Sequence, residues 1–395
     1  MKKQNMSVCL AAIVAAMLTV ISMTVYSNDN RSTVVSPSTE FVVDIKVNQH
    51  NTNEIYAVVA KNGLYKSTDK GETWIYCDIG IPNNDYSRIE FDPVNRIIYA
   101  RTSSALFRSY DFKNWVKLAE FRWLSGILLR STDQSKILYV RTSDGLYYSK
   151  DEHAWEKIDN RHEAYSNTDF YLVAIDRADP GIVYFMIKRP MTFVHADEVE
   201  AYKSSGLWKA DDSGIYKSRD QGKTVERMLS TRSDILLISP SDANVMYSAD
   251  RITTGVGADS IMVSRILKSI DRGASWEVQC KLDLIIVERL IANPVDHNEL
   301  YAIIMDYRHL QNNNYDLEVS TLDDLPQSKQ VLLKSSDGGK TWQDISLGSP
   351  FNNKNHIASI AVDALNPEVL YIGAAYGFFK SADAGKTWKA IKISK

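Results

Sequence analysis

The sequence predicts an all-β protein, a seven-bladed β-propeller with four-stranded antiparallel blades. A Ser-x-Asp motif recurs seven times along the chain, and a tyrosine several residues after a turn recurs seven times in step with it. Between these markers lie short apolar runs bounded by Gly, Pro, Asn and Asp. Two independent markers with equal counts indicate seven copies of one structural unit.

The first marker, in its fullest form, is Ser-x-Asp-x-Gly-x-x-Trp. Its positions are Ser67, Asp69, Gly71 and Trp74; Ser109, Asp111 and Trp115; Ser149, Asp151 and Trp155; Ser218, Asp220 and Gly222; Ser269, Asp271, Gly273 and Trp276; Ser335, Asp337, Gly339 and Trp342; and Ser381, Asp383, Gly385 and Trp388. The second and third copies are one residue shorter and lack the Gly, and the fourth has Val225 in place of the Trp. The second marker is a tyrosine before each Ser: Tyr56, Tyr99, Tyr139, Tyr184, Tyr247, Tyr301 and Tyr371.

Each unit contains four candidate strands, called A to D in chain order. In the second unit these are residues 87–91, 96–101 with the Tyr, 105–109 leading into the Ser, and 115–118 starting at the Trp. Alternating or apolar runs of this length, bounded by turn residues, are typical of strands. Four strands per repeat, at a shortest spacing of 40 to 46 residues, favour a propeller blade over a solenoid coil.

The Ser-x-Asp motif falls between strands C and D, where it suits a turn. Ser and Asp side chains accept hydrogen bonds from nearby backbone N–H groups, Gly takes a positive φ, and Trp offers a large packing surface. The alternative is that residues such as Asp69 or Asp337 are catalytic. We favour the structural interpretation, because a catalytic group is not needed seven times around a ring.

On these motifs the chain resembles proteins with Asp-box repeats, also called bacterial neuraminidase repeats. Such repeats occur in sialidases, in xyloglucanase-like glycoside hydrolases, in the sortilin receptor domain and in photosystem II assembly factors of the propeller type. The resemblance covers residues 41–395. It implies the propeller fold, with Asp-box turns between strands C and D, but does not choose between hydrolases and binding proteins.

The N-terminal 27 residues have the layout of a secretory signal peptide: Lys2 and Lys3, an apolar run over residues 10–26, then polar residues. The alternative is an uncleaved N-terminal anchor, since about 17 apolar residues approach the length that spans a bilayer. Residues 28–40, rich in Ser, Thr and Asn, are expected to form a disordered tether before the propeller at 41–395. The protein is therefore expected to be secreted or periplasmic.

Composition excludes several classes of function. The net charge is −3 with scattered Lys and Arg, so no basic stripe for nucleic acid is present. No zinc-ligand spacing, phosphate loop or nucleophile elbow occurs, and we expect no metal or cofactor. Cys77 and Cys280 fall on the D strands of blades 1 and 5, which are not neighbours, so we expect no disulfide between them.

Long insertions single out one face of the ring. Because strands alternate in direction, the B–C turns and the D–A loops between blades share one face, here called the B–C face, and the Ser-x-Asp turns lie on the other. The Tyr-to-Ser distance is 10 or 11 residues in blades 1, 2, 3 and 7, but 34, 22 and 34 in blades 4, 5 and 6. The insertions, at 185–213, 248–264 and 302–330, are expected to form a wall over the B–C face, and long loops on a rigid scaffold usually carry binding.

Aromatic and charged residues supply candidates on this face. The binding-face candidates are Arg88, Arg122, Trp123, Tyr202, Trp208, Arg289, Tyr307, Arg308 and Tyr315. The aromatic rings could stack on sugars or anchor a protein, or Tyr202 and Trp208 could simply pack an insertion onto the ring. Arg88, Arg122, Arg232 and Arg289 precede or begin inner strands, where an Arg could bind carboxylates or be solvated. The insertions also hold acidic residues, which suit a hydrolytic carboxylate pair, a cation site or surface solvation.

The resemblance also guides the choice between enzyme and binding module. A sialidase of this group implies an Arg-Ile-Pro segment, and the nearest match here is Arg88-Ile-Glu in the second blade. The xyloglucanase-like enzymes place acid and base on two propellers, and this chain has one. We therefore predict a non-catalytic, exported binding or assembly propeller that recognises a glycan or a cell-envelope protein through the B–C face; the alternative is a glycoside hydrolase using two insertion carboxylates.

Overall fold

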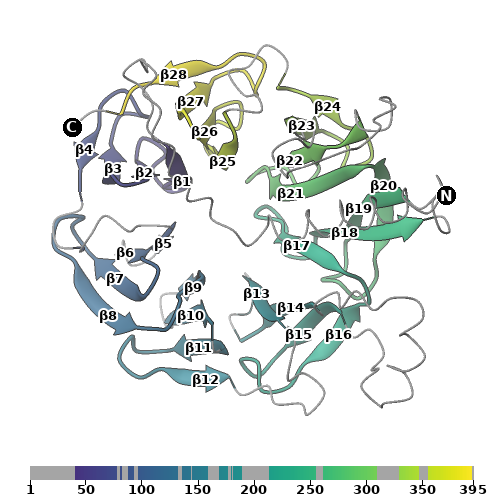
Figure 1. Cartoon of the computed structure of the whole chain (residues 1–395), viewed down its shortest axis with the longest axis horizontal. Coiled ribbons are helices and arrows are strands. Elements are labelled where there is room, and N and C mark those ends of the chain that lie inside the picture. Colours follow the sequence, from purple (N-terminus) through teal and green to yellow (C-terminus); the bar gives the residue numbers. More distant parts are fainter. Residues whose placement is uncertain are drawn as a thin grey trace, which may run out of the picture.

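The structure, a computed structural model, is a ring of seven four-stranded antiparallel sheets (Figure 1). It describes residues 41–77, 81, 88–92, 97–131, 136–143, 145–158, 169–176, 179, 181–188, 213–254, 261–308, 329–346 and 355–393. This part of the chain contains 28 strands and no α-helix, and so no helix that could cross a membrane. The predicted fold class, a seven-bladed propeller with four strands per blade, is confirmed.

In every blade the strands follow one another in chain order from the inside of the ring outward. Blades 1 to 4 contain β1 (Val42–Val47), β2 (Ile55–Val59), β3 (Gly63–Ser67) and β4 (Ile75–Tyr76); β5 (Arg88–Asp92), β6 (Ile97–Arg101), β7 (Ala105–Ser109) and β8 (Val116–Glu120); β9 (Gly126–Ser131), β10 (Lys136–Thr142), β11 (Gly145–Ser149) and β12 (Glu156–Ile158); and β13 (Asp169–Ile175), β14 (Val183–Lys188), β15 (Gly214–Ser218) and β16 (Glu226–Leu229). Blades 5 to 7 contain β17 (Ser233–Ile238), β18 (Met246–Thr254), β19 (Ile261–Ser269) and β20 (Glu277–Asp283); β21 (Ile285–Ala292), β22 (Leu300–Asp306), β23 (Lys329–Ser335) and β24 (Gln343–Asp344); and β25 (Ile357–Val362), β26 (Leu370–Ala374), β27 (Gly377–Ser381) and β28 (Lys389–Ile391).

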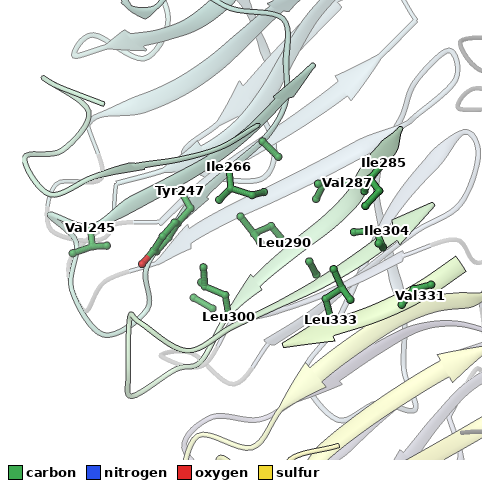
Figure 2. Close-up of a cluster of buried hydrophobic side chains, with 13 residues drawn as sticks. Val245, Tyr247, Ile266, Ile285, Val287, Leu290, Leu300, Ile304, Val331 and Leu333 are labelled. Carbon is green, nitrogen blue, oxygen red and sulfur yellow. The ribbon is translucent and has the colours of Figure 1, made fainter. Parts of the chain in front are cut away.

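The hydrophobic core lies between neighbouring blades. Figure 2 shows the cluster between blades 5 and 6, where Tyr247 and Ile266 of blade 5 meet Leu290, Leu300 and Leu333 of blade 6. The tyrosine of each B strand is fully buried, with exposed fractions of 0% in all seven blades. Burial of such side chains contributes about 1.5–3 kcal/mol each, so the repeated Tyr marks the packing position that joins one blade to the next.

The ring closes by packing between its first and last blades. Blade 1 is built wholly from β1 to β4 and blade 7 wholly from β25 to β28, so no blade mixes the two ends. Val42 and Ile45 of β1 share one core cluster with Val369, Tyr371 and Phe378 of blade 7. The closure predicted from the phase of the repeat is therefore confirmed.

The turns between strands C and D, here called the Ser-Asp turns, are closed by their own side chains. In blade 1 the Ser67 Oγ accepts a hydrogen bond from the Gly71 backbone N–H (2.8 Å), and the Asp69 carboxylate accepts one from the Thr73 N–H (2.8 Å). Trp74 donates its indole N–H to the Gly71 carbonyl at 3.1 Å. Hydrogen bonds from the Thr73 side chain and backbone and from Ser67 lower the pKa of Asp69 to about 2.

The two shortened Ser-Asp turns replace the Gly with a larger residue in the left-handed conformation. Phe112 has φ 63° and Glu152 has φ 68°. The Phe112 ring stacks on Tyr56 of blade 1 with centroids 4.8 Å apart, and the Glu152 carboxylate accepts hydrogen bonds from Tyr99 and Arg108 of blade 2. Each side chain therefore fills the space beside the preceding blade's tyrosine, and that contact opposes the strain of the backbone.

Some predicted boundaries were wrong. In blade 2, β8 begins after Trp115 and extends to Glu120, beyond the predicted end at residue 118. The predicted insertion at 248–264 is mostly strand, because β18 and β19 continue pairing outward as far as Thr254 and Ile261. Cys77, after β4, and Cys280, in β20, are both free, as their distant blades predict.

Candidate binding face

Hydrogen bonds between neighbouring loops define the B–C face beside blades 2 and 3. The D–A loop between β8 and β9 donates Phe121 N–H to the Ser104 carbonyl and Leu124 N–H to the Ser103 carbonyl, both in the B–C turn of blade 2. The B–C turn of blade 3 donates Ser143 N–H to the Arg122 carbonyl in the same loop. The loop from Phe121 to Ser125 is thus held from both sides.

Trp123, at the centre of this loop, is exposed and conformationally unusual. Its side chain is 70% exposed, and its φ is 52°, in the left-handed region that bulky residues rarely adopt. The Arg101 guanidinium also donates a hydrogen bond to the Leu124 carbonyl at 2.8 Å, next to the strained residue. The surrounding hydrogen bonds therefore fix the backbone in this conformation and hold the indole toward solvent.

A second exposed aromatic on the same face was not predicted. Tyr376, in the B–C turn between β26 and β27 of blade 7, is 52% exposed. Its backbone N–H is held by the Asn355 side chain at 2.8 Å. Phe41, just before β1, is 43% exposed and lies beside the B–C turn of blade 1, since its carbonyl accepts from the Ala60 N–H.

The inner strands of four consecutive blades carry a polar group at one register position, here called the axial cluster: Asp44, Arg88, Arg289 and Ser359. In each blade this residue pairs with the B-strand residue two positions after the buried tyrosine. Their strands β21, β25, β1 and β5 lie next to one another around the ring, nearest its centre (Figure 1). Equivalent positions in adjacent blades bring the four side chains to the same level near the axis.

Asp44 links three of these blades. Its carboxylate, 2% exposed as a residue, accepts hydrogen bonds from its neighbour Ile45 N–H (3.1 Å), Ser359 Oγ (3.3 Å), Arg88 (3.3 Å) and Ile89 N–H (3.1 Å). The Ile45 N–H also donates to Ser359 Oγ at 3.2 Å. A β-bulge between Val42 and Asp44 re-aims the strand at this point. The buried charge therefore joins blades 7, 1 and 2 where the ring closes.

Arg289 is the other cation of the axial cluster, and the structure shows it no hydrogen bond or ion pair within the described residues. It is partly buried and follows a second β-bulge, between Val287 and Arg289. Burial and the positive charge of Arg88 lower the pKa of Arg289 to about 10, although the charges of Asp44 and Glu288 oppose this shift. The guanidinium is thus held charged in an unfavourable environment.

The groups around the axial cluster are already paired. Glu288 accepts a hydrogen bond from the Gln330 amide at 2.8 Å, and the same Gln330 also bonds the backbone of Ile357 in blade 7. Lys46 pairs with Glu90 at 3.0 Å. Burial disfavours the charged form of Lys46, but the charges of Glu90 and Asp44 outweigh it and raise its pKa. Arg289 differs from all of these in having no partner group.

The other candidates fall in three groups. Arg122 is exposed, in the loop beside Trp123, and Arg232 lies just before β17. Arg308 pairs with Asp306 in an exposed contact at 2.6 Å, directly after the partly buried Tyr307. Tyr202, Trp208 and Tyr315 lie outside the described residues, as does most of the predicted wall of insertions. Arg289 was expected to begin or precede its strand, but it lies within β21, because that strand pairs with β22 as far as Asp306.

The described carboxylates are arranged for structure. Wherever a pKa shift of a carboxyl group is resolved in this part of the chain, its direction is downward, as in Asp69, Glu152 and Glu299. A general acid of a glycoside hydrolase needs the opposite shift. No group of His, Cys, Asp or Glu among the described residues could hold a metal ion. The insertion carboxylates, apart from Asp306, lie outside the described residues.

Asp44, Ser359 and Tyr376 were missed by the sequence analysis. Counting back from the B-strand tyrosine would have found the first two, since Asp44, Arg289 and Ser359 each stand 12 residues before it and Arg88 stands 11 before it. Tyr376 carried no signal, because it sits in a B–C turn of ordinary length.

No protein-family model matches the chain, and no curated protein matches it. Solved structures do match. The GH74 xyloglucanase from Xanthomonas campestris aligns over 92% of this chain with a TM-score of 0.61 and 15% identity, and this chain spans only 56% of that one. YCF48 from Cyanidioschyzon merolae aligns over 89% of this chain and 97% of its own, with a TM-score of 0.56 and 14% identity. YCF48 bound to D1 peptide aligns over 95% and 100%, with a TM-score of 0.51 and 14% identity. At such low identity these similarities show the fold alone.

Proposed function

We propose that the protein is an exported, non-catalytic binding or assembly propeller, and that its partner, a glycan or a cell-envelope protein, docks on the B–C face. One observation carries the proposal: Trp123 is 70% exposed on a left-handed backbone held by hydrogen bonds from two blades. The opposite face supplies the Ser-Asp turns, whose side chains are used to close the turns themselves.

The energetics of Trp123 support a binding role. A left-handed non-Gly residue costs about 1–2 kcal/mol, and strain of this kind collects at ligand sites. Exposing an indole forgoes the stabilisation that its burial in the core would give. A rigid, exposed Trp loses little entropy on binding, and Trp is enriched among the residues that dominate binding energy.

The comparisons support the two classes of partner without choosing between them. One structural neighbour is titled a xyloglucanase, which acts on a glycan, and another was solved with a bound peptide. We further propose that the Ser-Asp turns are Asp-box repeats, that residues 1–27 are a signal peptide or anchor, and that residues 28–40 tether a propeller of residues 41–395. The leader's charge and apolar run support export to the periplasm or medium.

The test is retention of ligands on the immobilised protein. Sialosides, plant and microbial glycans and solubilised cell-envelope proteins are offered to wild type, to Trp123→Ala and to a matched control, Ile270→Ala, which removes a side chain that is also 70% exposed but lies in a Ser-Asp turn. We expect wild type and I270A to retain the same ligand and W123A to bind it at least about tenfold more weakly. Equal retention by W123A would contradict the proposed face. Release of free sugar, read by mass spectrometry in the same assay, would replace binding with glycoside hydrolysis.

A further inference from the structure

The axial cluster carries one more positive charge than its own anion can neutralise. Asp44 supplies the single carboxylate of the cluster, and its hydrogen bonds go to Ile45, Ser359, Arg88 and Ile89. Glu288 and Glu90, the nearby acids, are hydrogen-bonded to Gln330 and paired with Lys46. Arg289 is left with the five N–H donors of its guanidinium and no acceptor shown among the described residues.

A partly buried guanidinium without an acceptor is costly, because it has lost water and gained no partner. The cost is reflected in the depressed pKa of Arg289, which burial and Arg88 both lower. An anion bound between Arg289 and Arg88 would relieve both effects. The site thus has a vacancy for negative charge that the fold itself leaves open.

The surroundings select the kind of anion. A guanidinium fork matches the two oxygens of a carboxylate in a planar, bidentate pair. Only one charge is unmatched, and Asp44 and Glu288 both act on Arg289 with negative charge. A dianionic phosphate would be repelled by these acids, whereas a monoanion balances the cluster.

We propose that Arg289, with Arg88 beside it, binds a carboxylate group of the ligand that docks on the B–C face. The inference rests on the proposed function for its biological ligand, but the site can be measured without that ligand. The carboxylate could come from a peptide C-terminus or from an acidic sugar. Both have the chemistry that the site recognises, and the experiment separates them.

The experiment follows the Arg289 guanidinium by NMR in arginine-labelled protein during titration with N-acetylalanine, its uncharged amide, and glucuronate. We expect a saturable shift of the Arg289 Nε–H signal with the two acids and none with the amide at matched ionic strength. The tighter of the two acids identifies the source as peptide or sugar.

Variants show whether Arg289 carries the binding. Arg289→Gln should weaken carboxylate binding at least about tenfold, as expected when a charge-assisted bidentate pair is lost. Arg289→Lys, which keeps the charge but loses the fork, should fall between Arg289→Gln and wild type. Arg272→Gln removes an equal charge from a Ser-Asp turn and should bind like wild type. Thermal unfolding of each variant confirms that it is folded.

Two results would overturn the proposal: no saturable shift in wild type, or equal carboxylate affinity in wild type and R289Q. Neither result bears on the docking face, because retention of the partner by W123A is measured separately. A partner lost from W123A but retained by R289Q would likewise sink the carboxylate site while leaving the proposed function intact.

Discussion

Replacing Asp44 by Asn should destabilise the ring at the seam between its first and last blades. Asp44 is 2% exposed and its carboxylate accepts hydrogen bonds from Ser359 in blade 7 and from Arg88 and Ile89 in blade 2. The Asn amide keeps one acceptor oxygen but turns an NH₂ toward a donor, and it leaves Arg88 without its anion. Breaking a buried ion pair in this way costs about 3–5 kcal/mol.

The lower end of that range applies, because the Arg88 side chain is 33% exposed and water screens part of the lost interaction. About 3 kcal/mol corresponds to a fall in Tm of about 6–12 °C for a domain of 150–250 residues, and less for a larger one. Differential scanning calorimetry of wild type and D44N measures the change. Asp306→Asn, which breaks the exposed pair with Arg308, is the control and should shift Tm by no more than about 2 °C. A D44N shift as small as that of the control would refute the reasoning that a buried charge holds the seam.

Other consequences can be checked on stability alone. Glu152 is buried; burial tends to raise its pKa, but hydrogen bonds from Lys136 and Tyr99 and the charges of Lys136 and Arg108 lower it overall. A lowered folded pKa gives stability that is present above the unfolded pKa of about 4.3 and is lost as pH falls through the folded value. The difference in Tm between wild type and Glu152→Gln should therefore be large at pH 7 and shrink below about pH 4; a constant difference would contradict it. Gly273→Ala should lower stability by about 1–3 kcal/mol, since φ is 82° and the new Cβ would lie 2.0 Å from the Met228 methyl carbon; urea unfolding at the wild-type value would disprove it. The two described cysteines are free, so both should be alkylated in denaturant without reductant, and a disulfide peptide in the mass spectrum would show otherwise.

The blade count could be predicted because two markers are fixed by local physics. Each Ser-Asp turn needs a Ser and an Asp to close it, and each blade interface needs a large buried side chain at the Tyr position. These requirements recur in every blade and are therefore visible as a repeat. The shortened turns also follow from local physics, but only the structure shows that Phe112 and Glu152 replace Gly by packing against the preceding blade.

The candidate site was predicted in part. Arg88, Trp123 and Arg289 were identified from their places in the repeat, but Asp44 was not, because a single Asp in an inner strand looks no different from a solvated one until the ring brings blades 7, 1 and 2 together. The left-handed backbone of Trp123 depends on hydrogen bonds from loops 20 residues away in either direction along the chain, such as that from Ser143. Ring closure and loop clamping of this kind join distant positions and leave no local pattern.

The most direct test of the docking face is photo-crosslinking with benzoylphenylalanine placed at position 123 or at position 270 in living cells of the native host. The two native side chains have the same exposed fraction, 70%, on opposite faces of the ring. We expect position 123 to crosslink one discrete partner and position 270 to crosslink none. A partner captured at position 270 and not at position 123 would contradict the account.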